Sequence, residues 1–268
     1  MKKKLIIYIA GYGRSGSTVL NYKLSKYLSA LSIGEIANVN REYYLDVNSK
    51  CSCKKKYNSC KLIKSFIYKN KKKNIEIWYK KIMPQTDYLI RYFFYLYVKK
   101  IKKIRNVHLN KLEEIKKEFD IIDKFYPNAI IIDSSKSTLL TSNRPYILKK
   151  LGYEVVIIHI VKSFYLTFKS VKKGSDSFLK KRIKKEKSFR LLRFFINYFF
   201  SNIRALLLAR NFHYIFIKNN DLLTRDSYVL ERISKFVSKI VLNKKIKIKK
   251  TNDRHLVGGN RLKKHLEF

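Results

Sequence analysis

Residues 11–18, GYGRSGST, directly follow the apolar run LIIYIA and have the composition of an oxyanion-binding loop. Gly13 and Gly16 allow the backbone to approach a ligand closely. Successive N–H groups at a helix start bind anions through local dipoles and unpaired donors. Three hydroxyl side chains add further donors: Ser15, Ser17 and Thr18. The segment therefore predicts a phosphate or sulfate site, although many glycine-rich turns only join a strand to a helix.

The lysine of a nucleotide-hydrolysing P-loop is absent from this segment. The Walker pattern G-x-x-x-x-G-K-[ST] would place it where Ser17 stands, and the cation of the loop is Arg14. Asp133, at the end of the run IIID, could still be the carboxylate that holds magnesium in an NTPase. A kinase or NTPase dependent on a nucleoside triphosphate therefore remains an alternative.

Further cations follow two other apolar runs. Lys136, in DSSKS, is suited to neutralise a sulfate or phosphate directly. Lys162 ends the run HIVK and Ser170 lies two helical turns later, so both could hold a second phosphate. Ligands of open parallel sheets bind at the carboxyl ends of the strands, which is where these residues are expected.

The elements that must position these residues alternate between strand and helix. Strands are predicted at 5–10, 129–132, 154–161 and in HYIFIKNNDLL. Helices are predicted in TVLNYKLSKYLSAL, at 145–151 before Gly152, in SFYLTFKSVKKG and at 228–240. This alternation indicates an α/β fold with a P-loop-like central parallel sheet flanked by helices.

Two stretches depart from that alternation. Residues 41–128 are basic, aromatic and helical in their periodicity, and we interpret them as a helical insertion in a single domain of residues 1–268. The segment TNDRHLVGGNRLKK, rich in turn residues and basic charge, is predicted to be a loop.

The chain is strongly basic, with 61 Lys and Arg against 19 Asp and Glu and a net charge of +42. Such a field attracts polyanions such as nucleic acid, acidic glycans or an anionic membrane. Drift in amino-acid composition explains the high net charge equally well, because the lysines are spread over the whole length of the chain. We expect a soluble, cytoplasmic protein, since the apolar-rich stretch 191–212 is interrupted by charge; peripheral membrane contact through charge stays open.

Three cysteines form the sequence CSCKKKYNSC: Cys51, Cys53 and Cys60. Their odd number argues against a disulfide framework. A zinc site would need a fourth ligand, and none is close by in the sequence, with His108 far away. The spacing alone therefore favours no metal.

Taken together, these motifs resemble one family. GYGRSGST, IGE, DSSK, VK-x7-S and HLVGGN are similar to the motifs of sulfotransferases that use 3′-phosphoadenosine 5′-phosphosulfate (PAPS), especially the bacterial and tyrosylprotein-type branches. The resemblance extends from residue 5 to about residue 262 and is weakest in the insertion. CSC…C after the GE element also resembles a recurring feature of bacterial members.

The resemblance implies roles for individual residues. Arg14 to Thr18 would hold the 5′-phosphosulfate, and Lys162 with Ser170 would bind the 3′-phosphate. A late loop would close over the nucleotide: Gly258, Gly259, Asn260 and Arg261. Lys162 replaces the usual arginine and loses its bidentate fork. The sequence KSFY replaces the family's R-D-P-R-type segment.

The resemblance also implies a general base, Glu35 in SIGEIANV, since a carboxylate near the donor could accept the acceptor's proton. His255, close to the GGN sequence, is a rival, whereas His159 lies mid-strand and is expected in the core. Arg14 and Lys136 would stabilise the developing charge, and no metal or other cofactor than PAPS is expected.

The reaction implied is transfer of a sulfuryl group to a hydroxyl or amine of an acceptor, for which we expect a saccharide or glycolipid. The basic charge and the aromatic insertion would suit such an acceptor. A third hypothesis is a nonenzymatic basic protein that binds polyanions. No motif for specific nucleic-acid recognition is present, and the oligomeric state is not readable from the sequence.

Overall fold

The fold comes from a computed structural model that describes residues 4–40, 43, 48–67, 104–136, 143–172, 190–251 and 253–257. Its centre is a six-stranded sheet with the order β5-β4-β1-β3-β2-β6, in which all neighbouring strands are parallel. The strands are β1 (Leu5–Ala10), β2 (Leu31–Gly34), β3 (Ile131–Asp133), β4 (Glu154–Val161), β5 (His213–Lys218) and β6 (Arg254–Val257). The predicted α/β fold class is confirmed.

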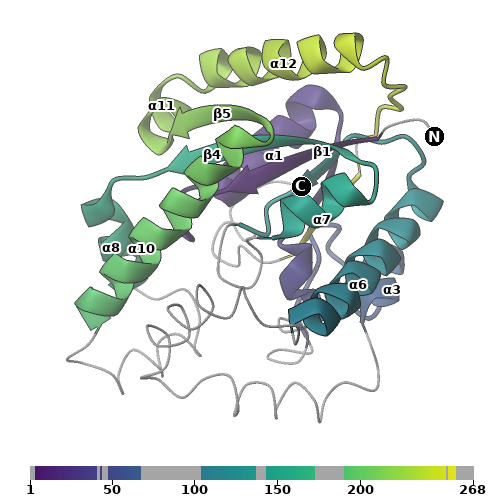
Figure 1. The fold of residues 1–268 in the computed structure, drawn as a ribbon, viewed down its shortest axis with the longest axis horizontal. Helices are drawn as coiled ribbons and strands as arrows, with labels where there is room; N and C mark the ends of the chain where they lie inside the picture. Colours follow the sequence, from purple (N-terminus) through teal and green to yellow (C-terminus); the bar gives the residue numbers. More distant parts are fainter. Residues whose placement is uncertain are drawn as a thin grey trace.

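The two faces of the sheet are covered by different helices because side chains alternate along each strand. On β1, Leu5, Ile7 and Ile9 belong to one apolar core, which includes residues of α1 (Ser17–Leu28) and α12 (Asp226–Asn243). Ile6 and Tyr8 belong to the opposite core. Figure 1 shows α12 along one side of the sheet and α6 and α7 on the other.

The second face is covered by helices from several parts of the chain. They are α3 (Lys61–Phe66), α6 (Ile104–Phe125), α7 (Arg144–Lys150) and α10 (Arg190–Leu207). The remaining helical segments are η1 (Ile36–Asn38), α8 (Phe164–Lys172), η2 (Leu208–Arg210) and α11 (Asn219–Thr224). The strands and helices predicted from residue 129 onward are found within a few residues of the expected bounds, with one exception. The strand predicted in HYIFIKNNDLL ends at Lys218, and the residues NNDLL begin α11.

Two strands were not predicted. β2 is only four residues long, and its sequence LSIG carries little strand signal. β6 lies inside TNDRHLVGGNRLKK, so the prediction of a loop there is wrong for residues 254–257. β6 forms at the edge of the sheet because it pairs with β2, which the local sequence cannot reveal.

Within the predicted insertion, α3 and α6 are helical, whereas residues 48–60 form turns and an isolated β-bridge, so the prediction of helix is wrong there. Residues 41, 42, 44–47 and 68–103 lie outside the described part. Its division from the rest of the chain remains a prediction. None of the helices within the described ranges is long and apolar enough to cross a membrane.

Candidate functional site at the carboxyl edge of the sheet

Because the strands are parallel, the loops that follow β1, β2, β3, β4 and β5 all leave from one edge of the sheet. The glycine loop follows β1, Glu35 follows β2, and Lys136 follows β3. Lys162 follows β4 directly. The topology thus brings together, at one edge, residues that the sequence separates by up to about 150 positions.

The loop after β1 turns sharply to start α1. Gly11 (φ 120°), Arg14 (φ 70°) and Gly16 (φ 91°) adopt the left-handed region. A Cβ on Gly11 would lie 2.5 Å from the carbonyl oxygen of Ile160, so glycine is required at this close approach. The Ser15 hydroxyl donates to the Tyr12 carbonyl at 2.7 Å, which holds the turn.

Gly16 is the N-cap of α1, and within the described part of the chain no side chain caps this helix end. The first N–H groups of α1 therefore point toward the loop, as an anion site needs. A Cβ on Gly16 would collide with the side-chain amide of Asn219, the first residue of α11 after β5. Asn219 is 6% exposed. Nothing in the local sequence links Asn219 to the glycine loop.

Glu35 and Lys136 form an ion pair, although 101 positions separate them. Each side chain is 14% exposed. The Oε2 atom of Glu35 also accepts from the Asn38 side-chain amide at 3.0 Å. A carboxylate at this position could act as a general base, and the Lys136 ammonium lies beside it. The structure therefore joins the expected base to an expected cation.

The backbone fixes both partners of this pair. Gly34 (φ 62°) packs so closely on β6 that a Cβ would lie 2.5 Å from the Val257 nitrogen, and the Glu35 N–H donates to the Val257 carbonyl at 2.8 Å. Lys136 has a φ of 67°, and its carbonyl accepts from the Tyr8 hydroxyl. β1, β2 and β6 thus all contribute to the position of the pair.

A buried hydrogen-bond chain crosses from β2 through α1 to the segment after β3. The Ser32 hydroxyl donates to Oδ1 of Asn21 at 2.5 Å, and the Asn21 amide donates to the Ser134 hydroxyl at 3.1 Å. Asn21 is fully buried. Each of these buried polar groups has a hydrogen-bond partner. The hydrogen bonds therefore hold α1, the helix that follows the glycine loop, against the segment that carries Lys136.

Both carboxylate oxygens of Asp133 accept hydrogen bonds from protein groups. Its Oδ2 accepts from the Arg144 Nε at 2.7 Å, and its Oδ1 accepts from the Ser135 N–H at 2.8 Å. Arg144 also pairs with Glu118 at 2.8 Å, and Asp133 is fully buried. A metal ion on Asp133 would have to displace a guanidinium, which argues against the magnesium role of the kinase alternative.

The expected 3′-phosphate residues lie on β4 and α8. Lys162 directly follows β4, its backbone carbonyl accepts from the Tyr198 hydroxyl at 2.7 Å, and both it and Ser170 are partly exposed. Tyr198 also packs on Tyr12 of the glycine loop, with ring centroids 5.8 Å apart. Nothing in the local sequence around Tyr198 indicates this role. Gly258, Gly259, Asn260 and Arg261 lie outside the described residues.

Two histidines have distinct surroundings. His159 is 3% exposed and bonds the Tyr214 hydroxyl and the Asn202 side chain, and burial lowers its pKa. The prediction that it belongs to the core is confirmed. His255 lies on β6 with its Nδ1 facing Cys60 and Cys51, at 3.3 and 3.6 Å from the sulfur atoms. Its ring nitrogens are thus engaged away from Glu35.

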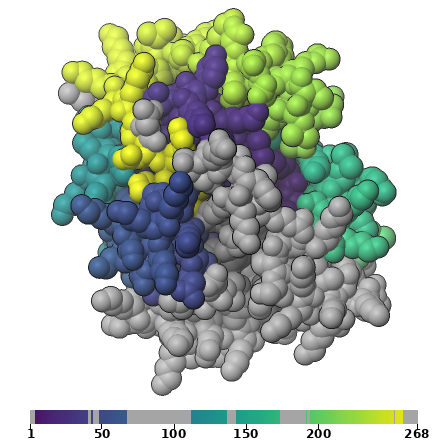
Figure 2. Space-filling view, turned by 180° about the vertical axis from the view of Figure 1, so that it is seen from behind, coloured from purple at the N-terminus to yellow at the C-terminus, as the bar shows by residue number. Residues whose placement is uncertain are grey.

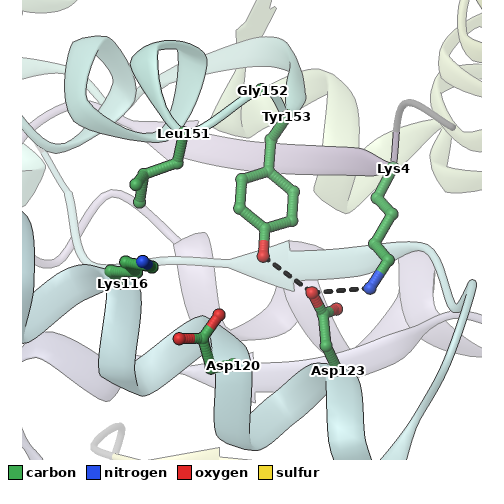
Figure 3. Close-up of a pocket in the computed structure, with 7 residues that line it drawn as sticks. All are labelled: Lys4, Lys116, Asp120, Asp123, Leu151, Gly152 and Tyr153. Carbon is green, nitrogen blue, oxygen red and sulfur yellow. Dashed lines mark hydrogen bonds and ion pairs between the residues drawn. The ribbon is translucent and has the colours of Figure 1, made fainter. Parts of the chain in front are cut away.

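A pocket of about 190 Å³ lies elsewhere in the fold (Figure 3). Its lining includes Lys4, Asp123 and Tyr153, and Asp123 accepts from both others, at 2.6 and 2.8 Å. Lys4 precedes β1 and Tyr153 precedes β4, so this pocket lies at the amino edge of the sheet. It is therefore separate from the site formed by the strand ends.

No protein-family model matches the chain, and no curated protein matches it. Among solved structures, the sulfotransferase STF9 from Mycobacterium avium matches with a TM-score of 0.50 and 11% identity over 88% of this chain and 64% of that one. The chain has a sulfotransferase fold.

Two further solved structures are similar. The sulfotransferase domain of the curacin biosynthetic pathway has a TM-score of 0.48 and 16% identity over 93% of this chain and 76% of that one. The sulfotransferase domain of the Synechococcus PCC 7002 olefin synthase has a TM-score of 0.40 and 15% identity over 89% and 74%. Membership of the tyrosylprotein-type branch remains a prediction.

Proposed function

We propose that the chain is a PAPS-dependent sulfotransferase. The observation that carries this proposal is the ion pair of Glu35 and Lys136, held at the same sheet edge as a glycine loop that lacks the P-loop lysine. A base and a cation beside an oxyanion loop are what transfer of a sulfuryl group to a hydroxyl requires. The sulfotransferase fold of a solved structure adds support.

In this mechanism the acceptor oxygen attacks the sulfur in line, and its proton moves to the carboxylate of Glu35. The bond between sulfur and the bridging oxygen breaks, and adenosine 3′,5′-bisphosphate leaves with the electron pair. Arg14 and Lys136 stabilise the charge that develops on the sulfuryl and bridging oxygens. Lys162 and Ser170 bind the 3′-phosphate.

Two further observations argue against a reaction that uses a nucleoside triphosphate. Ser17 stands in the place of the phosphate-binding lysine. Asp133, the residue considered above as a magnesium ligand, accepts from Arg144 and from the Ser135 backbone. Cationic side chains would instead balance the charge of the phosphosulfate.

We further propose an acidic or hydroxyl-rich saccharide or glycolipid as the acceptor. The net charge of +42 favours an anionic substrate or an anionic surface near it. A cytoplasmic location with peripheral membrane contact belongs to the same proposal.

The test is transfer of labelled sulfate from PAPS to a panel of polysaccharide, glycolipid and peptide acceptors. Arg14→Ala is expected to abolish transfer, because the loop loses its cation. Arg210→Ala removes the same charge from η2, on the exposed surface, and is expected to retain activity. Full activity of Arg14→Ala would overturn its assignment.

Calorimetry separates the three hypotheses. The sulfotransferase binds adenosine 3′,5′-bisphosphate without magnesium, and Ser170→Ala weakens that binding sharply, whereas Ser227→Ala on the exposed start of α12 leaves it unchanged. Magnesium-dependent ATP binding would support the kinase instead. Binding of polyanions alone, steeply salt-dependent and unaffected by Arg14→Ala, would support the third hypothesis.

A further inference from the structure

Four potential metal ligands gather from two distant parts of the chain. They are Cys51, Cys53 and Cys60, which the sequence places together, and His255 on β6. Their ligand atoms all lie within 4.8 Å of one another. The Nδ1 atom of His255 is 3.3 Å from the Cys60 sulfur and 3.6 Å from the Cys51 sulfur. His255 is thus the fourth ligand that sequence spacing could not supply.

The cysteines lie on a compact turn followed by a helix start. Lys50 and Lys56 form an antiparallel bridge, and between them the Cys51 N–H donates to the Lys55 carbonyl at 2.9 Å. Cys60 is the N-cap of α3. Cys51 and Cys60 are 3% and 1% exposed. Backbone hydrogen bonds therefore hold the turn that carries Cys51 and Cys60.

The same turn is attached to β6 by a serine between the first two cysteines. The Ser52 hydroxyl donates to the Arg254 carbonyl at 2.7 Å and accepts from the Leu256 N–H at 2.8 Å. These two bonds flank His255 on its strand. Figure 2 shows the 48–67 region directly beside the C-terminal segment that contains β6. The Ser52 hydroxyl thus ties the cysteine turn to β6 by contacts that do not involve the side chains of the cysteines or of His255.

The orientation of the His255 ring suits a metal ligand. Its Nε2 is 2.9 Å from the Tyr126 hydroxyl. In the tautomer in which Nε2–H donates to Tyr126, Nδ1 presents its lone pair toward the sulfur atoms. Metal-bound histidines commonly have such an outer hydrogen bond, which fixes tautomer and ring orientation.

We propose that Cys51, Cys53, Cys60 and His255 bind one Zn²⁺ as a closed, structural site. Zinc in structural sites takes four tetrahedral ligands, with sulfur at about 2.3 Å and nitrogen at about 2.0 Å. Tetrahedral geometry at those lengths separates ligand atoms by roughly 3.5–4 Å, close to the Nδ1–sulfur distances here. Four protein ligands leave no open position for catalysis.

The charge balance agrees with zinc. Three thiolates, a neutral imidazole and Zn²⁺ carry one net negative charge, and the thiol protons are released on binding. Three exposed lysines of the same turn lie beside it in sequence: Lys54, Lys55 and Lys56. A disulfide would pair two of the three sulfur atoms and would leave unexplained why the His255 Nδ1 faces them. A soft, thiolate-binding cation accounts for all four groups.

The metal would connect the cysteine turn to the edge strand that supports the catalytic carboxylate. Val257, two residues after His255, accepts from the Glu35 N–H. Zinc would therefore stabilise β6 and, through it, the position of Glu35. The metal would not take part in sulfuryl transfer.

The test begins with the full chain purified from zinc-supplemented cells. Elemental analysis is expected to give one zinc per chain, and thiol modification with a mercurial is expected to release it to a colorimetric indicator. Replacement by Co²⁺ should give the visible absorption of a tetrahedral ion and a near-ultraviolet thiolate-to-cobalt band. Metal-free chain with three freely reactive thiols, or with a disulfide, would overturn the proposal.

Variants identify the ligands. Cys60→Ser is expected to lose most of the bound metal, and His255→Cys is expected to retain it with a shifted cobalt spectrum, as a fourth thiolate requires. His213→Asn, at the exposed start of β5, is the control and should bind one Co²⁺ unchanged. If Cys60→Ser does not fold, the cobalt spectra of the wild type and of His255→Cys still show whether His255 is a metal ligand. Identical spectra for those two proteins would refute His255 as a ligand.

Discussion

Replacement of Arg144 by Met should reveal how strongly the buried ion triad stabilises the fold. The guanidinium lies between Asp133 and Glu118, at 2.7 and 2.8 Å, and its side chain is 3% exposed. It also lies over the ring of Phe119, with 5.4 Å between the guanidinium carbon and the ring centroid. Met keeps the apolar contact with that ring and removes only the charge and its donors.

The expected loss of unfolding free energy is about 3–5 kcal/mol, the usual cost of removing one partner from a buried ion pair. Two carboxylates lose their cation together. Asp133 keeps its bond from the Ser135 N–H, whereas the Glu118 side chain, 15% exposed, retains limited contact with water. For a domain stable by about 5–15 kcal/mol, this is a large fraction of the total.

The loss of unfolding free energy caused by Arg144→Met should increase as the pH rises. Burial raises the pKa of Glu118, and the charge of Arg144 opposes that rise. Without Arg144 the folded-state pKa rises further above the unfolded value of about 4.3. Above that value the unfolded chain has lost a proton that the folded chain retains, so stability falls as pH rises toward the folded pKa.

Urea unfolding followed by far-ultraviolet circular dichroism, at about pH 5 and about pH 7.5, measures both effects. The double variant Arg144→Met/Glu118→Gln is the control, because it removes the titrating group and should remove most of the added pH dependence. A cost below about 1 kcal/mol for Arg144→Met at both pH values would refute the reasoning. So would an equal pH dependence of the single and double variants.

Two further predictions concern the carboxyl edge. Gly16→Ala should lower the unfolding free energy by at least about 1 kcal/mol, because its φ is 91° and a Cβ would meet Asn219, whereas Gly13→Ala has open space and should cost less than about 0.5 kcal/mol. Thermal unfolding compares the two, and equal costs would contradict the steric argument. Tyr198→Phe removes the bond to the Lys162 carbonyl, worth about 1 kcal/mol, and should weaken binding of adenosine 3′,5′-bisphosphate roughly fivefold in calorimetry. Unchanged affinity would show that the bond does not position Lys162.

The strands inside the sheet could be predicted because their sequences are almost continuously apolar. The run EVVIIHIV, apolar except for Glu154 and His159, has the same bounds as β4, and LIIYIA has the same bounds as β1, since strands buried on both faces need mostly apolar side chains. β2 and β6 are four residues each and have no such run. These two strands form because neighbouring strands supply their hydrogen-bond partners. Strand pairing, and not the local sequence, therefore determines where they lie.

For the site, the sequence identified residue types and the structure decided which of them meet. The glycine loop was recognisable because Gly11 and Gly16 need backbone conformations that few other residues adopt. The pairing of Glu35 with Lys136 required the strand order β1-β3-β2, in which their loops become neighbours. Asn219 and Tyr198 gave no sequence signal, because their roles depend entirely on packing against distant segments.

The sequence by itself determined the fold class and placed the glycines of the loop, and likewise the three cysteines, close together, because each of these features depends on residues that are near one another in the chain. Tertiary structure alone decided that Asp133 is neutralised by Arg144 and that His255 joins the cysteines. These contacts arise when parallel strands align their ends and an edge strand adds to the sheet. Local sequence patterns do not reveal such contacts, so the ion pair that disfavours a magnesium role for Asp133 and the grouping of His255 with the cysteines both depend on the folded chain.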